Sequence, residues 1–481
     1  MKSDKEFLVK GALINGIGLT TRVISPLLVI LLARFFSPAA FGLYVAFQAL
    51  VLTLSRFSVL ALDKGLLWYV SRIDRGRAGT DHGLAGSALL ATAICAILFL
   101  GFAAAAWSGI LSRFESLEGA SVPFVLMMMA ALWPYSIIQL FSSALEGLRM
   151  PQYRVVLALF MTNSLVPAIA LLLKASLPGD ISLGAGMLLG NAIGMAAFIP
   201  FIRRHFPGEA WSLKARVPPQ LLRYSVPLAF SEMVAPLLGR VDLWMILLLL
   251  GPEKVAIYAV MITVTNGLRT VRQTFDPLLL PIVSKLEPGE LHTKLRPSFS
   301  YATYMVSTIQ LFIACFVLIF PKEILSIAGK SYAIEVFAFA LLLLGNLANG
   351  FLGLNGLVVL GIGNSRLASA IILSALGLNL VGNWFLIPPL GITGAALVNC
   401  LVLLYQNVIH FVYIRFVRGL RLYEPWLITN AALEVALLAL FFLAYHRIEA
   451  LPLAARIGLY LALSLGLGAW VLVKRRWAKA G

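Results

Sequence analysis

Charged residues, and acidic residues above all, are scarce in this chain of 481 amino acids. Only 12% of its residues are charged and 60% are hydrophobic, whereas soluble proteins average about 25% charged and 45–50% apolar residues. A soluble protein of this length would form about three domains, whose surfaces need more charge than this composition supplies. The composition therefore excludes an ordinary soluble protein.

Cysteine and histidine are too few and too scattered to hold a metal ion. The three cysteines, Cys95, Cys315 and Cys400, lie far apart in apolar segments, and no two of the five histidines have ligand spacing. The same spacing argues against a disulfide framework. We expect the cysteines to be small core residues, and we expect no metal and no cofactor.

Long apolar segments are what the sequence has in abundance. Runs of about 20 residues can cross the roughly 30 Å of hydrocarbon in a bilayer. We predict an all-α polytopic membrane protein with about 14 transmembrane helices, joined by loops too short to form a soluble active site. The predicted spans are Gly11–Ala33, Pro38–Ala61, Leu84–Trp107, Val122–Leu145, Tyr153–Leu173, Ile181–Pro200, Leu221–Leu250, Val255–Leu280, Pro297–Phe320, Ala333–Leu360, Leu367–Ile387, Ile392–Val417, Pro425–Tyr445 and Pro452–Val473.

The basic residues follow the topology that these spans predict. Lys and Arg total 38 against 21 Asp and Glu, a formal net charge of +17. Sorted by loop, 25 of the cations lie on the side of both termini and 8 on the other side. The positive-inside rule then predicts that both termini are cytoplasmic. Because topology explains most of the basicity, we expect no nucleic acid partner.

The two halves of the chain resemble each other at a shift of 210–214 residues. Phe41-Gly42-Leu43-Tyr44 aligns with Val255-Ala256-Ile257-Tyr258. A unit of six helices gives two copies with the same orientation in the membrane, which enclose a cavity between them. We therefore predict two parallel six-helix lobes around a central cavity: an N-lobe at 1–202, a cytoplasmic linker at 203–220, a C-lobe at 221–418 and two further helices at 419–481.

Five cations lie well inside predicted spans, at least five residues from either end, and all five are arginines. A charge at the centre of a span costs roughly 2.5–3.5 kcal/mol unless it faces water, an anion or a carboxylate. The planar guanidinium group suits anions with paired oxygens, such as phosphate or carboxylate. We predict a substrate-binding cationic cavity formed by Arg22, Arg56, Arg240, Arg269 and Arg272.

A second interpretation is that these arginines extend to the membrane interface or neutralise nearby acids. Arg272 can reach Asp276 one helical turn later, and Arg240 is close to Asp242 in the sequence, although on nearly the opposite helix face. The acids are themselves candidates for ion coupling, or are counter-ions to arginine. This set comprises Asp242, Asp276 and Glu232.

The segment Phe36–Tyr44, the stretch Asn383–Leu397 and the two six-helix lobes together resemble a known family over essentially the whole chain. This family is the polysaccharide-transporter branch of the multidrug/oligosaccharidyl-lipid/polysaccharide exporter superfamily. The resemblance implies a flippase in the bacterial inner membrane that carries undecaprenyl-diphosphate-linked oligosaccharide to the periplasmic leaflet by alternating access. Its product would enter surface polysaccharide such as the O-antigen of lipopolysaccharide.

The resemblance also implies partners and a role for the arginines. Related lipid II flippases carry arginines in helices one, two and eight of a central cationic cavity, the helices that hold Arg22, Arg56, Arg269 and Arg272 here. Their last two helices border a groove for the lipid tail, where Glu434 would either face the groove or pack against a neighbour. The implied partners are the lipid-linked oligosaccharide, the bilayer, a polysaccharide polymerase or chain-length regulator, and a monovalent cation or proton.

Three other functions remain open at this point. The chain could be a lipid II flippase, or a cation-coupled drug or metabolite exporter of the same superfamily, which would use intramembrane carboxylates instead of arginines. A membrane enzyme, such as a polyprenyl-linked glycosyltransferase or a polymerase, would need a long external loop or acidic metal ligands. The first external loop, at 34–37, is short and has no carboxylate. We therefore predict that the chain is not an enzyme.

Overall fold

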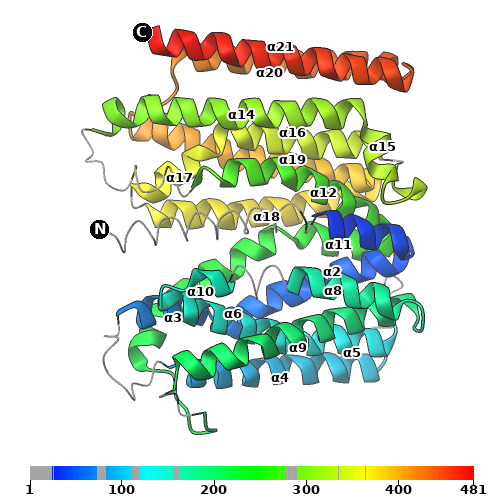
Figure 1. The fold of residues 1–481 in the computed structure, drawn as a ribbon, viewed down its shortest axis with the longest axis vertical. Coiled ribbons are helices and arrows are strands. Elements are labelled where there is room, and N and C mark those ends of the chain that lie inside the picture. Colours follow the sequence, from blue (N-terminus) through cyan, green and yellow to red (C-terminus); the bar gives the residue numbers. More distant parts are fainter. Residues whose placement is uncertain are drawn as a thin grey trace. The chain divides into compact units, whose positions relative to one another are not determined.

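The computed structural model describes residues 24, 26–72, 83–110, 117, 119–154, 162–207, 209, 211–276, 279, 283, 290–333, 335–362 and 364–480. This part of the chain is helical and contains no β-strand. It forms two compact units, Met1–Val260 and Met261–Gly481, whose helices are shown in Figure 1. The predicted all-α fold is confirmed.

The first unit contains the helices from the N-terminal part of the chain to the first turns of α12. A helix at Pro26–Phe35 comes first. The following helices are α2 (Pro38–Val59), α3 (Leu62–Arg72), α4 (Leu84–Trp107), α5 (Val122–Ala130), α6 (Leu132–Gly147), α7 (Pro151–Tyr153), α8 (Thr162–Leu173), α9 (Gly179–His205), α10 (Pro219–Leu238), α11 (Val241–Leu250) and α12 (Pro252–Gln273).

Small residues set the closest helix contact of this unit. Gly186 and Gly190 lie four residues apart on α9 and face α8, which packs directly against it. A Cβ added at Gly190 would lie 2.9 Å from the Cα of Val166, and one at Gly186 would lie 2.9 Å from the amide nitrogen of Ala170. In a membrane, such glycine pairs allow two backbones to approach closely.

Helices α10 and α11 pack on α2 and α3 within the first unit. The Trp68 ring of α3 stacks on the Tyr224 ring of α10, with centroids 4.5 Å apart. The indole of Trp244 on α11 donates to the backbone oxygen of Ala46 on α2 (3.1 Å). The sequence repeat assigns α10 and α11 to the C-lobe, and the lobe boundaries at 202, 220 and 418 stay predictions.

The repeat-paired residues Gly42 and Ala256 meet in the first unit. A Cβ added at Gly42 would overlap the carbonyl oxygen of Pro252, and would lie 3.2 Å from the amide nitrogen of Ala256. Residues related by a two-fold axis meet their own equivalents close to that axis. Glycine at position 42 therefore lets the start of α12 approach α2 at the place where two repeats would touch.

The second unit has its own bundle, in which α16 packs on both α14 and α19 (Figure 1). Among its described residues, seven asparagines are buried and serve as polar links between or within helices; for example, Asn407 donates to Asn349 across α19 and α16 (3.1 Å). Its helices are α14 (Arg296–Ile319), α15 (Pro321–Ser326), α16 (Val336–Leu352), α17 (Leu354–Gly361), α18 (Ser365–Leu390), α19 (Ile392–Val412), α20 (Pro425–Glu449) and α21 (Leu453–Ala480), with short turns η4 (Leu291–Leu295), η5 (Lys330–Tyr332) and η6 (Tyr413–Val417).

The predicted spans can be compared with the helices of the described residues. Nine of these helices are long and apolar enough to cross a membrane, and eleven when each of two bent pairs is one span. Helix α4 has the predicted bounds, and the predicted span Ala333–Leu360 bends by 43° between α16 and α17. The chain is thus a multi-pass membrane protein. The count of 14 stays a prediction, since most of the first span lies outside the described residues.

Candidate functional site

Arg56 lies between two carboxylates of the first unit. It occupies the last turn of α2, and its Nη1 is 3.4 Å from Oδ2 of Asp63, in the first turn of α3. The same nitrogen is 3.8 Å from Oε2 of Glu232 on α10. Asp63 is buried, whereas about a third of the Glu232 side chain is exposed. The guanidinium thus has one sheltered partner and one that solvent can reach.

An unusual turn between α2 and α3 brings Asp63 to Arg56. Leu60 and Ala61 both have positive φ angles, 49° and 56°, which cost side-chain-bearing residues on the order of 1–2 kcal/mol each. The amide of Leu60 donates to the backbone oxygen of Arg56 (3.1 Å). Burial of Ala61 and Leu62 and the Arg56–Asp63 ion pair offset this cost. Arg56 therefore holds the turn with both its backbone and its side chain.

A second arginine lies at a break between helices close to Arg56. Arg240 follows Gly239 between α10 and α11, with a non-helical backbone at φ −140°. Arg240, Arg56 and Tyr135 on α6 lie within electrostatic range of one another. The predicted span Leu221–Leu250 is therefore interrupted at the arginine that was assigned to the cavity. We call Arg56, Asp63, Tyr135, Glu232 and Arg240 the arginine cluster.

Asp242 is deeply buried and has a structural partner. It lies in the first turn of α11, where its Oδ1 accepts the amide of Leu243 (3.0 Å) and its Oδ2 accepts the Tyr258 hydroxyl (2.8 Å). Arg240 interacts with it electrostatically. Asp242 therefore links α11 to α12, and a role in ion coupling stays a prediction.

In the second unit, Arg272 has the partner that its spacing predicts. Its Nη1 is 3.2 Å from Oδ1 of Asp276. Its Cδ would lie 2.9 Å from a Cβ added at Gly353, which is the bend between α16 and α17. Arg269 is half-buried one turn earlier on α12. Arg22 lies outside the described residues, and a central cavity that unites all five arginines stays a prediction.

Glu434 has no charged partner among the described residues, but its carboxylate is hydrogen-bonded. Its Oε1 accepts from Ser307 on α14 (3.0 Å) and from Asn430 one turn earlier on α20 (2.8 Å). Trp470 on α21 donates to Asn430 (2.7 Å). Glu434 lines an apolar cavity of about 480 Å³ between α14, α20 and α21. It thus both packs against a neighbour and faces a cavity.

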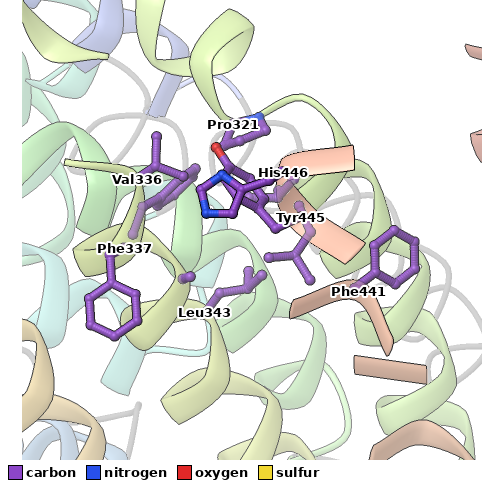
Figure 2. Close-up of a pocket in the computed structure, with 11 residues that line it drawn as sticks. Pro321, Val336, Phe337, Leu343, Phe441, Tyr445 and His446 are labelled. Carbon is purple, nitrogen blue, oxygen red and sulfur yellow. The ribbon is translucent and has the colours of Figure 1, made fainter. Parts of the chain in front are cut away.

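A second cavity of this unit, of about 320 Å³, lies among α14, α16 and α20. Figure 2 shows the imidazole of His446 between Pro321 and Leu343, with Phe441 at one side. Beside it, Lys322 pairs with Glu449. The walls are apolar apart from Tyr445 and His446.

The comparison with known families decides the classification. The sequence model of the polysaccharide biosynthesis protein family matches residues 8–287, which is more than half of the chain. The chain belongs to this family. The resemblance read from the sequence is thereby confirmed at the level of the family and its exporter superfamily, and the O-antigen branch stays a prediction.

Solved structures with the same fold include flippases and drug exporters. A lipid II flippase, MurJ, in an inward closed conformation aligns with a TM-score of 0.71 at 12% identity, over 96% of this chain and 100% of that one. An inward-facing multidrug resistance MATE family transporter gives 0.64 at 14% identity, over 83% and 94%. The Vibrio cholerae MATE transporter VcmN in its bent form gives a TM-score of 0.54 at 15% identity, over 87% of this chain and 98% of that one. No curated protein matches the sequence. At these identities, the likeness shows the fold alone.

Proposed function

We propose that this family member is a flippase for undecaprenyl-diphosphate-linked oligosaccharide, with the arginine cluster as part of its binding site for the diphosphate. The observation that carries the proposal is the position of Arg56, whose guanidinium lies between the buried Asp63 carboxylate and the partly exposed Glu232 carboxylate, with Arg240 within electrostatic range. Arg56 on α2 and Arg240 between α10 and α11 together offer paired N–H donors, which can bind the oxygens of a diphosphate.

The two carboxylates have different parts in this proposal. Asp63 is sheltered and closer to Arg56, so it keeps the guanidinium in place. Glu232 is more exposed and its oxygen is 3.8 Å away, so an incoming diphosphate displaces it from Arg56. The cluster then exchanges a protein carboxylate for a substrate phosphate. Because Glu232 pairs with Arg56 while the site is empty and the phosphate pairs with it afterwards, the arginine charge is compensated in both states.

Transport follows from the architecture of the superfamily. Two repeated lobes that rock against each other would expose the site to one leaflet and then to the other. We propose that both termini are cytoplasmic in a bacterial inner membrane, that a cation gradient or proton gradient supplies the energy, and that a polymerase or chain-length regulator receives the product. Asp242 and Asp276 are the proposed coupling groups.

The test uses cells that lack their own flippase and depend on this chain for surface polysaccharide. Arg56→Ala and Arg269→Ala are each expected to lower polysaccharide export per molecule of protein in the membrane, with the amount of each variant measured by immunoblot. Arg418→Ala, at an exposed position after η6, is the matched control and should export normally. Full export with Arg56→Ala would overturn the role of the arginine cluster, and full export with both variants would overturn the predicted cationic cavity of Arg22, Arg56, Arg240, Arg269 and Arg272 as well.

A drug or metabolite exporter is the second candidate function, because Asp242 is a fully buried intramembrane carboxylate. Drug efflux that is lost in Asp242→Asn or Asp276→Asn, together with unchanged polysaccharide export, would favour it. The flippase proposal predicts the opposite pattern, in which polysaccharide export depends on the arginines and no drug is expelled.

A further inference from the structure

The segment between α9 and α10 is fixed on the start of α4. The carboxylate of Glu209 accepts the backbone amide of Ala85 (2.9 Å) and that of Leu84 (3.4 Å), two of the unpaired amides at the N-terminus of α4. Further along, the backbone of Arg216 and Val217 passes directly over Gly86, where a Cβ would lie 2.7 Å from the amide nitrogen of Val217. The connection from α9 to α10 is therefore a docked part of the first unit.

A cavity of about 630 Å³ lies between this connection and helices α4, α6 and α9. Its walls are mostly apolar, with Ile199 and Phe141 among them. Trp211 of the connection packs edge-on against Phe141, with centroids 6.1 Å apart, and the indole of Trp133 donates to Thr92 (2.9 Å). Both tryptophans are about half exposed. We call this cavity, with its two tryptophans, the linker groove.

Among the described residues that line the linker groove, the only charge is positive. Arg203, in the last turn of α9, lines the groove, and no carboxylate does. Lys214 and Arg216 are exposed on the connection and Arg204 is exposed at the end of α9. Within the described part of the chain, these four cations form no ion pair. The Glu209 carboxylate is occupied by the amides of α4. Arg203 lines the groove, and the other three cations are within three residues of a lining residue in the sequence. We call these four cations the cationic rim, which attracts an anion.

The position of the groove points to a lipid as its occupant. Helix α9 is long and apolar enough to cross a membrane, and the groove opens at its C-terminal end. Exposed tryptophans are typical of the depth at which lipid head groups meet hydrocarbon. Apolar walls and a cationic rim at that depth match the two ends of an acidic lipid.

We propose that the linker groove binds an anionic phospholipid such as phosphatidylglycerol. One acyl chain lies along the walls formed by α4, α6 and α9, and the phosphate group contacts Arg203 and the Lys214 ammonium. The site is separate from the arginine cluster and does not depend on the transported substrate. It anchors the connection between the two repeats to the membrane surface.

The experiment measures contact quenching of tryptophan fluorescence in nanodiscs that contain the full chain. Phosphatidylglycerol with brominated acyl chains should quench more strongly than brominated phosphatidylcholine, and Trp133→Phe/Trp211→Phe should abolish the difference. Each surface cation raises the binding of an acidic lipid about five-fold. Arg203→Gln/Lys214→Gln should therefore weaken phosphatidylglycerol binding roughly 30-fold. The matched control Arg418→Gln, at an exposed cation of the second unit, should bind normally.

Three results would overturn the proposal: equal quenching by the two brominated lipids, a preference for phosphatidylglycerol that survives in Arg203→Gln/Lys214→Gln, or complete displacement of phosphatidylglycerol by an equal amount of undecaprenyl phosphate. The last result would assign the groove to the polyprenyl carrier. Because the readout is lipid contact and not export, failure of the flippase proposal would leave these outcomes unchanged.

Discussion

The close approach of α12 to α2 at Gly42 leads to a quantitative prediction. A Cβ at this position would lie 2.7 Å from the carbonyl carbon of Pro252, whereas carbon atoms in contact are about 3.5–4.0 Å apart. The two backbones would have to separate by about 1 Å, since no flexible side chain is available to move. Overpacking of this kind costs about 1–3 kcal/mol. We expect Gly42→Ala to lie at the upper end of that range.

The three cysteines supply the assay, because all are buried in the folded protein. A maleimide dye that fluoresces on reaction with thiols will report thermal unfolding of the purified chain. A loss of about 2–3 kcal/mol should lower the midpoint of unfolding by roughly 4–12 °C in a unit of this size. Gly101→Ala is the control, because nothing lies within 4 Å of its added Cβ. A midpoint for Gly42→Ala equal to that of Gly101→Ala would refute the argument from backbone contact.

The same dye assay checks three further predictions. Gly190→Val should lower the unfolding midpoint, because its side chain would separate α8 from α9; an unchanged midpoint would contradict the glycine contact. Arg56→Met should cost about 2–4 kcal/mol by leaving the buried Asp63 carboxylate unpaired, and Arg56→Met/Asp63→Leu should recover most of this loss; a double variant no better than the single one would exclude the pairing. Tyr258→Phe should cost about 1.5–3 kcal/mol, because the buried Asp242 carboxylate loses the hydrogen bond that the Tyr258 hydroxyl donates to it. A loss below about 0.5 kcal/mol would show that this hydrogen bond contributes little.

Features that depend on local spacing were predictable from the sequence. Helix α4 begins and ends where its apolar run does, because a membrane span needs about 20 apolar residues and little else. The Arg272–Asp276 pair follows directly from four-residue helical spacing. Of the two motifs that carried the family resemblance, Phe36–Tyr44 lies within residues 8–287, which the family model matches, and Asn383–Leu397 lies outside them.

The surroundings of Arg56 were not predictable in the same way. Asp63 is seven residues later and reaches Arg56 through a turn in which Leu60 and Ala61, neither of them glycine, adopt positive φ angles. No propensity rule predicts that conformation. Tyr135 comes from α6 and Glu232 from α10, so their proximity depends on tertiary packing that helical periodicity does not encode.

The measurement that tests the flippase proposal most directly is lipid translocation by the purified chain. Proteoliposomes would carry undecaprenyl-diphosphate-linked oligosaccharide with a fluorescent sugar, and an impermeant reductant would report how much of it reaches the outer leaflet. We predict translocation by the unmodified chain and by Arg418→Ala, and its loss in Arg56→Ala. Translocation by Arg56→Ala at the rate of the unmodified chain, or none by the unmodified chain under an imposed membrane potential and proton gradient, would contradict the account.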